Sequence, residues 1–247
     1  MIIIYLSNLK TAIIIPVKNF DKSKTRLSPF LSLEQRKVLC NHLVMDLLYK
    51  ISRLQESEII LITDESINMP KDMKQEPVII KENGTQGVNS AIALADPYIN
   101  TNDFDQSIVI PIDIPLLDVT ELSKLVHHSK KFKEGICIVP SYRFDGTNVL
   151  LRKPHSVIHT SYDNNSFFNH FKNALEKGVD IEIFDSGRMN LDIDNVEDIN
   201  ILLRKYFFIK TLVPNSLEKN LSHHRLDKNG NAIDYLLQLL ADYHQNY

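Results

Sequence analysis

The chain contains 247 residues, a length that accommodates one large domain or two small ones. With 43% hydrophobic and 24% charged residues, the composition is that of a globular protein and excludes disordered, collagen-like and low-complexity classes. The formal net charge of -3 gives no bulk electrostatic reason to bind nucleic acid, so any anion-binding site would have to be local.

Six short runs of apolar, often β-branched residues predict strands that are buried on both faces, as in a parallel sheet. These runs are residues 11–17, 58–63, 77–80, 107–112, 135–140 and 180–184. Helical periodicity predicts helices at residues 32–54, 86–94, 120–132, 166–175 and 196–203. The first helix opens with Ser32-Leu-Glu-Gln35, the spacing of a capping box. This alternation predicts an α/β fold with a mostly parallel central sheet and helices on both faces.

Two cysteines, Cys40 and Cys137, cannot build a disulfide framework, and no spaced Cys/His set predicts structural zinc. We therefore expect a reduced, cytoplasmic setting. The apolar first residues lack a basic region and a cleavage site, and Ser7, Asn8 and Lys10 interrupt the stretch that follows. We expect neither a signal peptide nor a membrane span.

Ligands of such sheets bind beyond the carboxyl ends of the strands. The residues of interest therefore follow Val17, Thr63, Ile80, Ile112 and Pro140. Residues 1–214 are expected to form the main domain, with a less regular subsidiary lobe around 141–185. Residues 215–247 form a C-terminal extension whose leucine-rich helix could cap the domain or pair with a second subunit.

Four cations follow the first predicted strand: Lys18, Lys22, Lys24 and Arg26. Lys neutralises phosphate as a point charge, and Arg grips it with two hydrogen bonds. The sequence has no GxxxxGK[ST] and no GxGxxG, so side chains would have to hold the phosphate. A solvated charged loop is the alternative interpretation.

Carboxylates follow two later segments. Asp113 lies between prolines at the end of the fourth predicted strand, where an uncompensated charge is costly. Asp192 and Asp194 alternate along an extended segment, so both can face one way. Three carboxylates opposite a basic loop are what a Mg²⁺-assisted reaction on a polyphosphate requires. The alternatives are helix caps, which suit Asp118 better than Asp113 and remain open for Asp194.

Nucleophilic catalysis has little support in the sequence. His155, His159 and His170 lack a Ser or Cys partner in any recognisable arrangement. The adjacent pairs at 127–128 and 223–224 are typical of surface positions, and Cys40 is typical of a core residue.

In order, these segments resemble a known family. The start IPVKNFDKSKTRLSPFLSLEQR is similar to the IPVK…K[ST]RL…L…ER opening of the 2-phospho-L-lactate guanylyltransferases. These enzymes are related to the molybdenum-cofactor guanylyltransferases. Five further blocks resemble motifs of the family: GVNSAI from Gly87, PIDIPLL from Pro111, GTNVLL from Gly146, SFFNH from Ser166 and LDIDNVED from Leu191. Together with the opening, the six blocks span about residues 11–204.

The resemblance implies a Rossmann-like, glycosyltransferase-A-like nucleotidyltransferase fold. It also implies transfer of GMP from GTP to 2-phospho-L-lactate or phosphoenolpyruvate, with release of pyrophosphate, in coenzyme F420 biosynthesis. The resemblance assigns Asp113, Asp192 and Asp194 to Mg²⁺ binding, and it assigns catalysis on the phosphates to Lys18, Lys24, Arg26 and Asp113. It assigns nucleotide binding to Pro16, Gly87 and Asn89, and phosphoacid binding to Thr147 and Ser166.

One departure concerns the acceptor. Tyr162 is followed by Asp163, where family members commonly have glycine. A carboxylate there would repel an anionic acceptor, so Asp163 must turn away, or the acceptor or its pose differs. The alternatives are a nucleotidyltransferase for another phosphoacid or sugar phosphate, and a non-catalytic nucleotide-binding subunit. We expect small-molecule partners only, with a homodimer left open.

Overall fold

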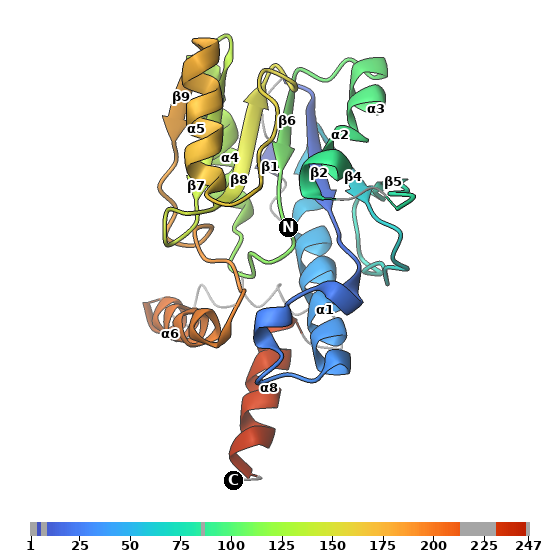
Figure 1. Ribbon diagram of the computed structural model, residues 1–247, viewed down its shortest axis with the longest axis vertical. Coiled ribbons are helices and arrows are strands. Elements are labelled where there is room, and N and C mark those ends of the chain that lie inside the picture. The colour runs from blue at the N-terminus through green and yellow to red at the C-terminus, as the bar shows by residue number, and fades with distance from the viewer. Residues whose placement is uncertain (1–3, 6–8, 85–86, 213–230, 246–247) are drawn as a thin grey trace.

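The structure is a computed structural model that describes residues 4–5, 9–84, 87–212 and 231–245. Its centre is a seven-stranded sheet of order β5-β4-β2-β6-β8-β7-β9 (Figure 1). The strands of this sheet are β2 (Thr11–Pro16), β4 (Ser57–Ile62), β5 (Val78–Ile80), β6 (Gln106–Val109), β7 (Gly135–Pro140), β8 (Thr147–Lys153) and β9 (Asp180–Ile183). Two short strands, β1 (Ile4–Tyr5) and β3 (Leu54–Gln55), pair separately.

Helices cover both faces of this sheet and its carboxyl edge. They are α1 (Leu33–Ile51), α2 (Val88–Ala93), α3 (Asp96–Thr101), α4 (Val119–His128), α5 (Ser166–Lys177), α6 (Val196–Leu212) and α8 (Ala232–Gln245), with 3-10 turns η1 (Phe20–Lys22), η2 (Thr25–Leu27) and η3 (Ser129–Lys131). The predicted α/β fold with a mostly parallel sheet is confirmed. The capping box of α1 is also present, with reciprocal bonds between Ser32 and Gln35.

The strand β8 corrects the sequence analysis. It runs antiparallel to both β6 and β7, between which it lies. Residues 141–185 were expected to be less regular, and no strand was predicted at 147–153, where β8 lies. The run from Thr147 to Lys153 has polar residues at both ends, so its apolar part is too short to predict a strand by itself. Its partners in the sheet supply the remaining stabilisation.

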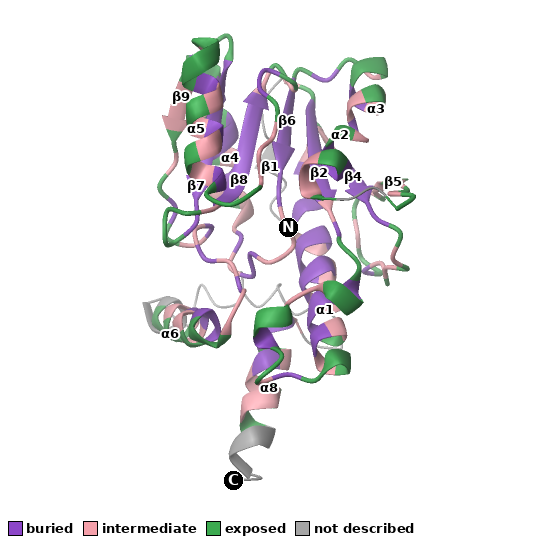
Figure 2. Ribbon diagram, viewed as in Figure 1, coloured by how far each residue is buried: buried purple, intermediate pink, exposed green. Residues whose placement is uncertain are grey.

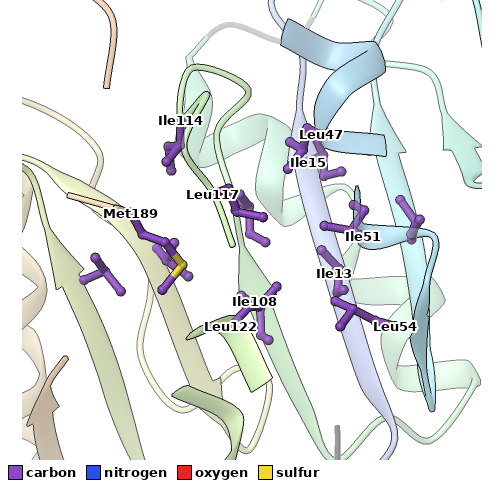
Figure 3. Packing of buried hydrophobic residues seen from close by; sticks show 14 of the residues in the cluster. Ile13, Ile15, Leu47, Ile51, Leu54, Ile108, Ile114, Leu117, Leu122 and Met189 are labelled. Carbon is purple, nitrogen blue, oxygen red and sulfur yellow. The ribbon is translucent and has the colours of Figure 1, made fainter. Parts of the chain in front are cut away.

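Alternate side chains of the strands fill the two faces, as the period of two requires. In β2, Ile13 and Ile15 pack with α1 and α4, whereas Ala12 and Ile14 pack on the opposite face. Figure 3 shows the first of these layers, where Leu47 and other residues of α1 meet the strands. The central strands are buried along most of their length (Figure 2).

A third apolar cluster closes the carboxyl end of the sheet. Leu27, the last residue of η2, and Leu31 pack there against α1, α6 and α8. On α8, Leu236 is fully buried, and the ring of Tyr235 stacks on His42 of α1 at 5.0 Å. The predicted C-terminal helix therefore caps the chain's own domain. The proposed boundary at residue 214 lies outside the described residues, and within the described ranges no helix has both the length and the apolar character to cross a membrane.

Candidate active site

The loop after β2 is fixed by its own side chains and by α1. Asn19 caps η1 by accepting a bond from the backbone N–H of Asp21 at 2.9 Å. The buried Arg36 of α1 donates to the carbonyl oxygen of Ser23 at 2.9 Å. Lys24 then adopts a left-handed conformation with φ of 54°, which is uncommon for a residue with a Cβ atom. The loop thereby directs Lys24 inward, where its side chain is only 6% exposed.

The two acidic segments are tied together by the backbone. Ile193 N–H donates to the carbonyl oxygen of Asp113 at 3.0 Å. The fully buried Asp198 accepts bonds from the N–H groups of Asp194 and its neighbour, both at 2.9 Å, and pairs with Arg143 at 2.7 Å. This buried carboxylate therefore sets the position of the 192–194 segment. Sequence reasoning did not identify Asp198 or Arg143 as supports.

The alternative roles as helix caps are now resolved. Asp118 caps α4 by accepting from the N–H groups of Thr120 and Glu121. The side chain of Asn195 accepts from the N–H of Glu197 at 2.9 Å at the start of α6. Asp194 is therefore not needed as a cap, and its carboxylate is available for the site.

Lys24 joins the two acidic segments. Its Nζ lies 2.6 Å from Asp113 Oδ2 and 3.0 Å from Asp194 Oδ1. Arg26 Nη1 lies 3.3 Å from the other oxygen of Asp194, on a largely exposed side chain. Burial favours the neutral amine, but the attraction of the two carboxylates outweighs it and raises the pKa of Lys24. The same attraction holds the pKa of Asp194 below its ordinary value, against the opposing effect of burial.

Asp192 carries the uncompensated charge of this cluster. Burial raises its pKa to about 6, and repulsion from Asp113 and Asp194 adds to that effect. Oxygen ligands of this kind suit Mg²⁺, and a cation would relieve the repulsion. In the described part of the chain, however, no three acidic, His or Cys side chains converge closely enough to hold an ion as they stand. The ammonium group of Lys24 bonds to two of the three carboxylates.

A cleft of about 410 Å³ opens beside this cluster. Its lining residues are Arg26, Ser141, Asp145, Gly146, Tyr162, Asp163, Asn164, Ser166, Asp192 and Asp194. Sequence reasoning did not assign the loop at 141–146 to the site. This loop is tight: Ser141 Oγ donates to Asp145 Oδ1 at 2.8 Å and accepts from the N–H of Gly146 at 2.9 Å. Two signals were available: the loop follows the predicted strand that ends at Pro140, and it directly precedes the GTN block.

The two residues assigned to the phosphoacid lie together, but they differ in access. Thr147 N–H donates to Ser166 Oγ at 2.8 Å, and both residues are 5% exposed. Ser166 lines the cleft, whereas Thr147 does not. Thr147 Oγ1 instead lies 3.0 Å from Nδ1 of His170. In the structure Thr147 therefore contacts the wall of the cleft and does not face its interior.

The residues assigned to the nucleotide lie outside the cleft lining. Pro16 ends β2 and is half-buried, and Lys18 is exposed beside it. Gly87 precedes α2 with φ of 88°, a conformation that favours glycine. Asn89 accepts from Tyr162 N–H at 2.7 Å and donates to Asp163 Oδ2 at 3.2 Å. Asn89 thus connects α2 to the wall of the cleft.

His170 supports this wall in its neutral form. Its Nε2 accepts from the N–H of Ser161 at 2.8 Å, so the neutral ring carries its proton on Nδ1. Burial lowers the pKa of His170 to about 4, and the nearby charge of Arg152 adds to the effect.

We expect His170 alone to lower the free energy of unfolding by about 2 kcal/mol when the pH falls from 7 to 5. The unfolded chain takes up this proton near pH 6.5 and the folded chain only near pH 4, so stability present above pH 6.5 is lost as the pH falls toward 4. Urea denaturation at both pH values measures the effect. His170→Gln should lack this component, and the exposed His159→Gln should retain it. An equal pH dependence in all three proteins would contradict the assignment.

Comparisons with known proteins agree with the fold. A protein described as a nucleotide-diphospho-sugar transferase, from Desulfovibrio desulfuricans G20, superposes with a TM-score of 0.69 at 16% identity, over 96% of this chain and 98% of that chain. A nucleotidyl transferase from Methanothermobacter thermautotroptrophicus superposes with a TM-score of 0.52 at 11% identity, over 83% of this chain and 100% of that chain. The fold is the Rossmann-like fold of nucleotidyltransferases.

The chain belongs to the Guanylyl transferase CofC like family, whose model matches residues 11–205. Curated relatives named 2-phospho-L-lactate guanylyltransferase include that of Methanothermobacter thermautotrophicus, 31% identical over 195 residues, which cover 79% of this chain and 85% of the relative. Another, from Methanocaldococcus jannaschii, is 33% identical over 194 residues, 77% of this chain and 81% of the relative. The family resemblance found in the sequence is confirmed.

Proposed function

We propose that this protein transfers GMP from GTP to a phosphoacid, 2-phospho-L-lactate or phosphoenolpyruvate, and releases pyrophosphate. The observation that carries the proposal is the cluster of Lys24, Asp113, Asp192 and Asp194 at the carboxyl edge of the sheet. Asp192 and Asp194 of this cluster line the cleft. Family membership supports GTP as the donor, because the curated relatives are named guanylyltransferases. The proposed setting is coenzyme F420 biosynthesis in the cytoplasm, with no nucleic acid partner, and the protein could act as a homodimer.

The chemistry requires little proton transfer. A phosphate monoester is largely dianionic at neutral pH, so its oxygen attacks the α-phosphorus in line without a general base. The protein must then position two polyanions and neutralise their charge. Lys18, Lys24 and Arg26 supply cations at the edge where the strands end.

Carboxylate oxygens of Asp113, Asp192 and Asp194 are proposed to hold Mg²⁺, which supplies further neutralisation of the triphosphate when bound. Lys24 would then exchange its carboxylate partners for a phosphate oxygen. Asp198 and Arg143 keep the 192–194 segment in register with Asp113 while this exchange occurs.

Pyrophosphate release in the presence of GTP and Mg²⁺ tests the proposal. The two phosphoacids are supplied in separate reactions, the products are identified by mass spectrometry, and ATP and CTP replace GTP as controls. A guanylylated phosphoacid is the expected product. Binding of GTP without pyrophosphate release from either phosphoacid would reject these two acceptors.

A further inference from the structure

Asp163 lies on the wall of the cleft, and its carboxylate is held in one orientation. The exposed segment 163–165 connects to α5 through a left-handed residue, Asn165, with φ of 63°. The side-chain amide of Asn89 holds this part of the chain through two hydrogen bonds. Its oxygen accepts from the N–H of Tyr162, and its nitrogen donates to Oδ2 of Asp163. Ser166, three residues further on, lines the same cleft. Asp163 therefore stands beside a residue already assigned to the acceptor.

The electrostatic surroundings of Asp163 differ from those of Asp145 and Asp194, two other carboxylates of the cleft. Asp194 is paired with Lys24 and Arg26, and Asp145 accepts a bond from Ser141. Asp163 accepts from a neutral amide, and within the described residues it forms no ion pair. Its charge is thus not neutralised by the protein. A donor group of a bound acceptor that faces Asp163 can therefore pair with this carboxylate.

We propose that Asp163 selects the acceptor: it favours a phosphomonoester that presents a hydroxyl or ammonium group to this wall over one that presents a carboxylate or an apolar group. This inference rests on the proposed nucleotidyl transfer and deepens it. A second carboxylate placed next to Asp163 would be repelled by it, which disfavours an acceptor that presents one to this wall. A hydroxyl or ammonium donor would instead form a charge-assisted hydrogen bond.

The test compares four acceptors with GTP and Mg²⁺. Phosphoenolpyruvate and 2-phospho-L-lactate have no hydroxyl or ammonium group, 3-phospho-D-glycerate has a hydroxyl, and O-phospho-L-serine has an ammonium group. For wild type, Asp163→Asn and Asp163→Gly, the quantity measured is the ratio of kcat/KM between each donor-bearing acceptor and phosphoenolpyruvate. We expect this ratio to fall about 10- to 100-fold in Asp163→Gly, since a hydrogen bond to a charged group contributes about 1.5–3 kcal/mol. Whether the ratio falls further for the hydroxyl or for the ammonium acceptor distinguishes the two donors.

A control variant and three outcomes decide whether Asp163 selects the acceptor. Asp72→Asn removes one exposed carboxylate that does not line the cleft and should leave the ratio unchanged. A ratio within about threefold of wild type in Asp163→Gly would overturn the selection by Asp163. A rise in KM for GTP with an unchanged acceptor ratio would assign Asp163 to the ribose and also overturn it. Failure of wild type to release pyrophosphate with all four acceptors would instead reject the proposed function itself.

Discussion

Replacement of Asp113 by asparagine is expected to lower kcat about 10²- to 10³-fold, the loss found when one preorganised electrostatic contact is removed from a reacting phosphoryl or acyl group. Asparagine has nearly the same shape as aspartate and can still accept a hydrogen bond from Lys24. The loop that carries residue 113 should therefore keep its geometry. The carbonyl oxygen of Asp113, which accepts from Ile193, is unaffected by the change. The charge is therefore the one property removed.

Pyrophosphate release measures the effect of Asp113→Asn, and circular dichroism with thermal unfolding checks the fold. Asp118→Asn is the matched control, because Asp118 lies on the same loop but caps α4 and binds Arg188. It should retain most of the activity. Near-normal turnover of the Asp113→Asn protein would reject both the metal assignment and the catalytic role of this carboxylate.

Replacement of Lys24 by glutamine is expected to lower the free energy of unfolding by about 3 kcal/mol, the smaller end of the range for breaking a buried ion pair. The change leaves Asp113, Asp192 and Asp194 close together without the ammonium that compensates two of them. Their mutual repulsion already raises the pKa of Asp192, in addition to the larger effect of burial, while Lys24 is present. Turnover should fall as well, because a cation on the phosphates is lost.

Urea denaturation in the presence of EDTA measures this loss without a contribution from bound metal. Arg26→Gln is the matched control: it removes a cation from the same Asp194, but its side chain is 73% exposed. Pairs exposed to solvent contribute about 0–1 kcal/mol, so Arg26→Gln should change stability by less than about 1 kcal/mol. Equal stability losses in the two variants would show that burial of Lys24 does not control the strength of its ion pairs.

Features that depend on local pattern could be predicted before the fold was known. Apolar β-branched runs predicted β2, β4 and their neighbours, because strands buried on both faces need continuous apolar residues. Short-range capping rules predicted the Ser32 and Gln35 box and the cap formed by Asp118. Since parallel strands end at one edge, the alternation of strands and helices also predicted where the basic and acidic segments would meet.

Contacts between distant segments became visible only in the folded chain. Lys24 is separated from Asp113 by 89 positions and from Asp194 by 170, and no local pattern encodes the bonds between them. β8 is a strand because β6 and β7 supply hydrogen bonds on both sides, which a short run with polar ends does not predict. The wall that carries Asp163 depends in the same way on Asn89, 74 positions earlier. Periodicity and capping act within a few residues, whereas an ion pair or a sheet register depends on the path of the whole chain.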